Sequence, residues 1–69
     1  MTPDEIRAIR ERLGLSKGQA ARLFGITQQG WVYLENGRNT ARGPLARLLR
    51  LAAADPAVVE ALRGMEGED

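Results

Sequence analysis

Signals that start a helix recur along this chain at short intervals, and they constrain its fold more than any other feature. Thr2-Pro3-Asp4-Glu5 combines an N-cap threonine, a proline at the first helical position and a glutamate three residues after the cap. Ser16-Lys17-Gly18-Gln19 forms a second capping box, and Thr27 and Asp55 are further N-cap residues. The chain is therefore divided into several short helices.

Apolar residues repeat between these signals with helical spacing. Ile6, Ile9 and Leu13 form one stripe. The polar stretch 38–43 interrupts the pattern as a loop, and no strand pattern or internal repeat is present. We predict five helices: from Thr2 to Gly14, from Ser16 to Gly25, from Thr27 to Asn36-Gly37, from Pro44 with Leu45, Leu48, Leu49 and Ala52 inward, and from Asp55-Pro56 with Val58, Val59 and Leu62. The expected fold is all-α and compact.

The 69 residues contain no Cys and no His, which narrows the chemistry of the chain. Thiol nucleophiles, imidazole bases, disulfides and the usual zinc ligands are missing. The carboxylates and the single tyrosine form no cluster suited to acid–base work. We therefore expect no enzyme, no metal, no cofactor and no small-molecule ligand.

The domain organisation follows from length and composition. We expect one helical domain over residues 1–63 and an acidic, flexible tail over residues 64–69. No apolar run approaches the roughly 20 residues that a membrane-spanning helix needs, and residues 1–5 lack the basic and apolar parts of a signal peptide. A cytoplasmic protein without a membrane partner is expected.

The net charge of +1 hides an asymmetry along the chain. Residues 16–50 carry six basic side chains against the single acid Glu35, whereas residues 51–69 carry five acids against the single base Arg63. A basic centre is typical either of solvated helix faces or of a surface that binds a polyanion. Charge alone leaves both readings open.

The second and third predicted helices have the spacing of a helix-turn-helix. Ala21 is small where two helices would cross, Gly25 can adopt positive φ in the turn, and Trp31 and Leu34 would anchor the later helix. The segment 15–38, which ends in Glu35-Asn36-Gly37-Arg38, resembles the Cro/C1-type, lambda-repressor-like helix-turn-helix family. The resemblance implies a five-helix DNA-binding domain that reads DNA with the third helix. It also implies a partly buried structural ion pair between Arg10 and Glu35.

Helical angles and this resemblance together select the residues that would meet double-stranded DNA. With Thr27, Trp31, Leu34 and Glu35 inward, the other face points out, and the base contacts expected on it are Gln28, Gln29, Val32 and Tyr33. The expected backbone contacts are Ser16, Lys17, Thr27, Asn36, Arg38, Asn39 and Arg42. Simpler roles stay open: Tyr33 could pack against the loop, and Arg47 and Arg50 could only solvate their helix. Gly30 could permit a close backbone approach to DNA.

One recognition helix reads only a few base pairs, so a homodimer on an inverted-repeat operator is expected. The predicted interface is the C-terminal apolar surface of Leu51, Val58, Val59 and Leu62, although these residues could instead only close the core of one chain. Such a dimer would repress its own operon by blocking polymerase.

The resemblance extends to two subgroups. The string from Gly30 to Arg38 is similar to a motif of some anti-CRISPR-associated regulators, and antitoxins of toxin–antitoxin operons use related domains. The alternative function is therefore an antitoxin-like module that neutralises a partner protein through the fifth helix, with DNA binding secondary.

Overall fold

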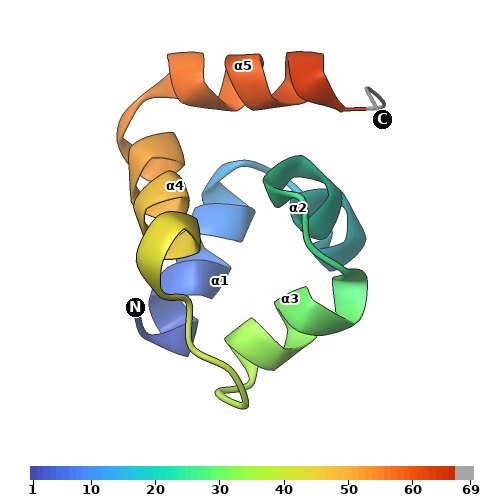
Figure 1. Ribbon diagram of the computed structural model, residues 1–69, viewed down its shortest axis with the longest axis vertical. Helices are drawn as coiled ribbons and strands as arrows, with labels where there is room; N and C mark the ends of the chain where they lie inside the picture. The colour runs from blue at the N-terminus through green and yellow to red at the C-terminus, as the bar shows by residue number, and fades with distance from the viewer. Residues whose placement is uncertain (67–69) are drawn as a thin grey trace.

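The computed structural model describes residues 1–66 as five helices packed around one core (Figure 1). The helices are α1 (Pro3–Arg12), α2 (Lys17–Phe24), α3 (Gln28–Glu35), α4 (Gly43–Ala54) and α5 (Pro56–Met65). The described residues contain no strand. The all-α, five-helix prediction is confirmed.

Local signals fix the ends of the first three helices. The Thr2 and Ser16 side chains accept hydrogen bonds from the backbone N–H groups of Glu5 and Gln19 at 3.1 Å, and both capping boxes are closed. Gly25 ends α2 at φ 76°, in the left-handed region that an L side chain rarely adopts. Ile26 and the Thr27 cap then complete a very short turn into α3.

The core is centred on α3, because its inward face carries the largest buried side chain. Trp31 is completely buried, and its ring stacks on Phe24 with centroids 5.7 Å apart. Ile6 of α1 and Leu49 of α4 are also fully buried and belong to the same core. The inward face of α3 thus packs against α1 and α2.

The loop between α3 and α4 differs in detail from the sequence prediction. Helix α4 begins at Gly43, one residue before Pro44, and its N-cap Arg42 makes no side-chain capping bond. Within the segment predicted as a polar loop, Ala41 is only 3% exposed and packs into the core. This small apolar residue anchors the loop on the core.

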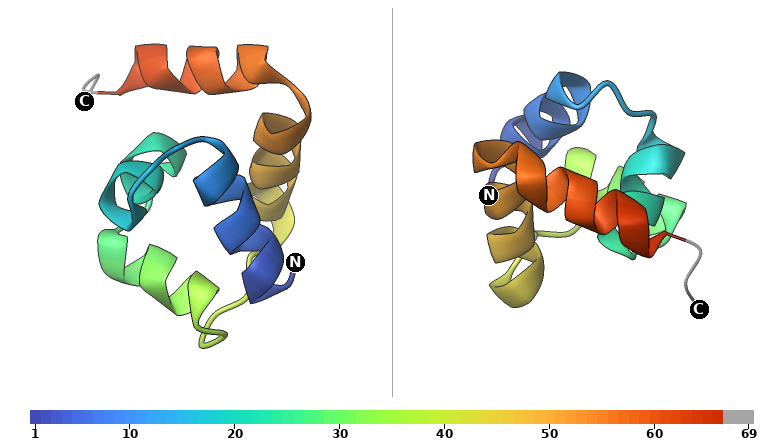
Figure 2. Two further views of the ribbon diagram at one scale, coloured as in Figure 1. Left: turned by 180° about the vertical axis from the view of Figure 1, so that it is seen from behind. Right: turned by 90° about the horizontal axis from the view of Figure 1, so that it is seen from above.

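Helix α5 covers the end of the molecule opposite α3 (Figures 1 and 2). Helix α5 continues to Met65, two residues beyond the expected domain end at residue 63, and the N–H of Glu66 bonds to the Arg63 carbonyl. The rest of the expected flexible tail, residues 67–69, lies outside the described residues. Among residues 1–66, no helix is long and apolar enough to span a membrane.

Candidate nucleic-acid interface

The inward face of α3 carries one buried carboxylate, that of Glu35, which accepts hydrogen bonds from two side chains. Arg10 donates to both oxygens of Glu35, at 2.6 Å from Nε and 3.2 Å from Nη2. The Trp31 indole N–H also donates to Glu35 Oε2. The ion pair that the resemblance implied is therefore present, and it joins α1 to α3.

Two further contacts complete this cluster. Arg10 Nη1 donates to the Leu15 carbonyl at 3.1 Å, which ties the start of the α2 segment to the same guanidinium. Arg7 Nε lies 3.6 Å from Glu35 Oε1 on a half-exposed side chain. The sequence prediction missed Arg7, although its position three residues before Arg10 places both on one face of α1.

The pKa of Glu35 reflects a balance of opposing effects. Burial acts to raise this pKa, but the hydrogen bonds from Arg10 and Trp31 outweigh it and hold the pKa below its ordinary value. The hydrogen bond to Glu35 likewise raises the pKa of Arg10. Both groups therefore stay charged at neutral pH, and the ion pair holds α3 against α1.

The outward face of α3 is polar and open. Gln28, Gln29 and Asn36 are exposed, whereas Val32 and Tyr33 are half-buried. Thr27 was expected to point inward and is exposed instead, because it is the N-cap residue with extended backbone and so leaves the helical face. Two glutamine amides therefore extend from the first turn of a helix whose other face is fixed in the core.

Gln28 lies against the first turn of α2. A methyl group added to Gly18 would sit 3.1 Å from Gln28 Oε1, closer than ordinary van der Waals contact. Gly18 therefore leaves space for this side chain. The sequence prediction did not assign Gly18 this role. The contact between Gly18 and Gln28 brings the first residue of α3 next to the N-terminal end of α2, where Ser16 and Lys17 lie.

Tyr33 contacts two other residues expected at DNA. Gln29 Nε2 donates to the Tyr33 hydroxyl at 2.7 Å. The Arg38 guanidinium lies over the Tyr33 ring, 5.3 Å from its centroid. Tyr33 thus joins the first turn of α3 to the loop that follows it.

Several predicted backbone contacts also shape the local chain. The Thr27 hydroxyl accepts from the Gly30 N–H at 3.0 Å, and a Cβ added at Gly30 would lie 3.0 Å from that oxygen. Asn36 Oδ1 accepts from the Arg38 N–H at 3.0 Å. A side chain at position 30 would therefore crowd the Thr27 hydroxyl that caps α3, which explains the glycine there. Asn36 shapes the turn that presents Arg38.

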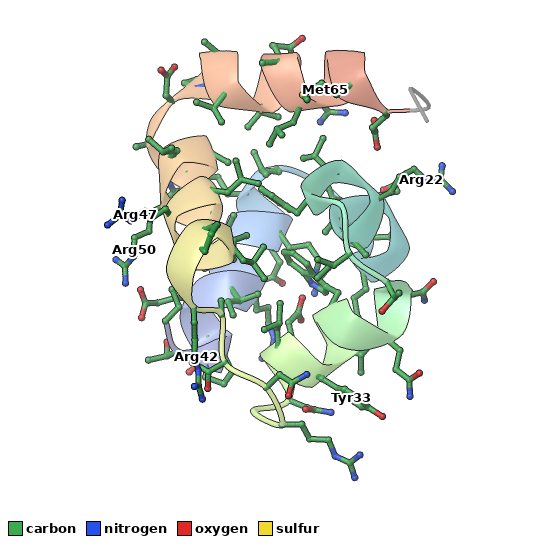
Figure 3. The ribbon with its side chains drawn as sticks, in the orientation of Figure 1. Arg22, Tyr33, Arg42, Arg47, Arg50 and Met65 are labelled. Carbon is green, nitrogen blue, oxygen red and sulfur yellow. The ribbon has the colours of Figure 1, made fainter. Side chains whose placement is uncertain are left out.

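The arginines labelled in Figure 3 lie in different parts of the molecule. Arg42 points from the same end of the molecule as Tyr33, whereas Arg47 and Arg50 extend from the flank of α4 and Arg22 extends from α2 (Figure 3). Asn39 and Arg42 also line a shallow hollow against Gly30 and Leu34 of α3. Of the arginines labelled in Figure 3, Arg42 is therefore the one that shares a hollow with residues of α3.

The C-terminal apolar residues do not form a single exposed surface. Val59 is 5% exposed and belongs to the core of the chain, which is the alternative role that the sequence left open for this residue. Val58 and Leu62 are half-buried against this core. Leu51 is 55% exposed, and Met65, which the sequence prediction missed because it assigned the residue to the tail, is 62% exposed.

The described residues hold no group of three or more acidic, His or Cys side chains that could bind a metal ion. None of their buried side-chain polar atoms lacks a hydrogen-bond partner.

Comparisons with known proteins agree with this geometry. The family described as a helix-turn-helix domain matches residues 4–62. Antitoxin HigA-2 of Vibrio cholerae serotype O1 is 36% identical over 56 residues, which cover 81% of this chain and 54% of that protein. The chain thus spans about half the length of this curated relative. No solved structure gave a significant match.

Proposed function

Because the chain belongs to the helix-turn-helix domain family, a family of DNA-binding regulators, we propose that it is a sequence-specific repressor that binds double-stranded DNA as a homodimer. The observation that best supports this function is the division of α3 into two faces. Trp31 and Glu35 are held in the core, while Gln28 and Gln29 are exposed at the start of the helix.

The two glutamines are the proposed base readers. A glutamine amide can bond bidentately to N6 and N7 of adenine in the major groove, and each good pair gives about 1–3 kcal/mol of discrimination. Both residues lie in the N-terminal turn of the second helix of the motif, which is the part that enters the groove. Val32, half-buried on the same helix, would contact a thymine methyl.

Phosphate contacts are proposed on both sides of the readers. Ser16 and Lys17 lie at the N-terminus of α2, where free N–H groups and the helix dipole favour an anion. Thr27, Asn36, Arg38, Asn39 and Arg42 would contact the backbone on the other side. These contacts give affinity without sequence information, so they make binding depend on salt.

A homodimer on an inverted repeat is proposed because two half-sites one helical turn apart double the sequence that is read. Leu51 and Met65 are the large hydrophobic side chains most exposed in the described chain, and half-buried Val58 and Leu62 lie on the helix that carries Met65. Repression would occur by blocking polymerase at the chain's own promoter. Leu51→Glu and Met65→Glu, compared by sedimentation, would show which residue contributes to the dimer.

Selection from random duplex DNA tests this function. The selected duplex and a shuffled duplex of equal length would be compared by fluorescence anisotropy across a salt series. We expect preferential binding of the selected inverted repeat, two chains per duplex, and a log-affinity slope of about −0.9 for each phosphate contacted. Failure to enrich any sequence, with equal weak binding to both duplexes, would contradict specific repression.

A second candidate function rests on the match to antitoxin HigA-2. In this alternative the chain neutralises a partner protein through α5, and DNA binding is secondary. The double variant Gln28→Ala/Gln29→Ala separates the two functions. A repressor would lose recognition of its operator, whereas an antitoxin-like module would still bind its partner protein. The assignment to anti-CRISPR-associated regulators stays a prediction, which the genes next to the coding sequence would test.

A further inference from the structure

The side chain of Tyr33 has two partners, and both are residues proposed to contact DNA. Its hydroxyl accepts a hydrogen bond of 2.7 Å from Gln29 Nε2. Its ring face lies under the Arg38 guanidinium, 5.3 Å away. The Tyr33 carbonyl also accepts from the Asn39 N–H at 3.1 Å, so the same residue holds the start of the loop.

We propose that Tyr33 is a positioning residue of the recognition surface, which orients the Gln29 amide through its hydroxyl and the Arg38 guanidinium through its ring. This inference rests on the function proposed above and replaces the base contact that the sequence analysis expected of Tyr33, because Tyr33 then acts on DNA through its neighbours. It predicts that the base contact of Gln29 and the phosphate contact of Arg38 depend on one side chain.

The chemistry of the amide explains why the hydroxyl matters. A glutamine amide has two N–H groups and one oxygen, and the bond to Tyr33 uses one of the N–H groups. The other N–H and the oxygen remain, and these are the two groups that a bidentate contact with adenine needs. Gln29 is otherwise an exposed, flexible side chain, so holding it before binding lowers the conformational entropy that binding must remove.

The ring has a separate effect on Arg38. An arginine on a loop loses rotamer freedom when it binds a phosphate, and stacking on an aromatic face limits that freedom beforehand. Asn36 already holds the Arg38 N–H through its side-chain oxygen at 3.0 Å. The backbone and the guanidinium of Arg38 are therefore both held next to the end of α3.

A double-mutant cycle tests the hydroxyl. Tyr33→Phe removes the bond to Gln29 and keeps the ring under Arg38, so we expect it to weaken binding of the selected duplex about 2- to 10-fold and to leave the shuffled duplex unaffected. In a Gln29→Ala background Tyr33→Phe should have no further effect. In a Gln28→Ala background its effect should persist in full, because Gln28 lies against Gly18 and not against Tyr33.

The ring is tested by comparing Tyr33→Leu with Tyr33→Phe. If Arg38 loses its phosphate contact without the ring, the salt slope of Tyr33→Leu should be smaller by about 1 than that of Tyr33→Phe. Circular dichroism melts establish that both variants fold; should Tyr33→Leu unfold, Arg38→Ala in the wild-type and Tyr33→Phe backgrounds replaces it, and the slope should fall by the same amount in both.

Nuclear magnetic resonance tests the pair without DNA. The 15N relaxation of the Gln29 side-chain amide should show greater mobility in Tyr33→Phe than in the wild type, with Gln28 unchanged. Equal mobility in both proteins, or an effect of Tyr33→Phe that persists in Gln29→Ala, would overturn the positioning role. Absence of any sequence preference in the wild type would instead contradict the proposed function, and the relaxation data would still decide the role of Tyr33.

Discussion

The two faces of the eight-residue helix α3 differ in how their polar groups are engaged. On the inward face every polar atom is engaged: Glu35 accepts from Arg10 and Trp31, and Trp31 stacks on Phe24. On the outward face Gln28 and Gln29 are exposed, and only Gln29 has a side-chain partner, Tyr33. The comparison shows how a short helix can be rigid in position and still present free hydrogen-bonding groups.

The largest loss of stability is expected when the carboxylate of the inward face is removed. Glu35→Ala leaves Arg10 without its partner and Trp31 without an acceptor, and we expect the free energy of unfolding to fall by about 3–5 kcal/mol. Urea denaturation followed by circular dichroism measures it. Arg7→Ala is the matched control, because this half-exposed arginine lies 3.6 Å from the same carboxylate and should change stability by less than about 1 kcal/mol. Similar losses in both variants would contradict the role given to burial.

A smaller loss is expected when one donor is removed. Trp31→Phe keeps an aromatic ring near Phe24 but removes the N–H that bonds to Glu35. We expect stability to fall by about 1.5–3 kcal/mol, the range for a hydrogen bond to a charged group. The same substitution in a Glu35→Gln background measures how much of this loss belongs to the charged acceptor. An unchanged loss there would attribute it to packing alone.

Lowering the pH tests the inward face in the wild-type protein, because it protonates Glu35. Because the folded-state pKa of Glu35 lies below the ordinary value of 4.5, its ionised form stabilises the fold above that pH. This contribution should be lost as the pH falls through the lower, folded-state pKa. Urea unfolding followed from about pH 6 downward, to about pH 2, should therefore show a steeper decline in stability for the wild type than for Glu35→Gln. Parallel curves would show that Glu35 does not contribute.

The smallest change in stability is expected on the outward face. Gln28→Ala and Gln29→Ala should each alter the free energy of unfolding by no more than about 0.5 kcal/mol, as is usual for surface positions. Each should nevertheless weaken binding to the selected duplex by about 1–3 kcal/mol. Fluorescence anisotropy with the selected and the shuffled duplex measures the specific and the non-specific affinity, and urea denaturation measures the stability. A loss of stability that matches the loss of affinity would mean that the two faces are not independent.

The sequence was sufficient for those parts of the fold that depend on local signals. Caps at Thr2, Ser16 and Thr27 and the positive φ of Gly25 act within a few residues, so the ends of the first three helices were predictable. The inward position of Trp31 followed from helical spacing. The ion pair of Arg10 with Glu35 joins residues 25 apart and was expected from the family resemblance.

Features that depend on tertiary packing could not be predicted in the same way. Val59 lies in the core and Leu51 is exposed, a distinction that depends on how α5 crosses the other helices. Ala41 anchors a loop that its polar neighbours made look fully solvated. The contact of Gln28 with Gly18 and the stacking of Arg38 on Tyr33 require the relative placement of two elements, which spacing along one helix does not give.

The most direct test of the division of α3 is a nuclear magnetic resonance titration of the 15N-labelled protein with the selected duplex. We predict large shifts for the side-chain amides of Gln28 and Gln29 and for the backbone amides at Lys17 and Arg38, while the Trp31 indole and the side chains of the core residues Ile6 and Leu49 stay nearly unchanged. Shifts concentrated in α5, or a strong change at the Trp31 indole with little change at the two glutamines, would contradict the account.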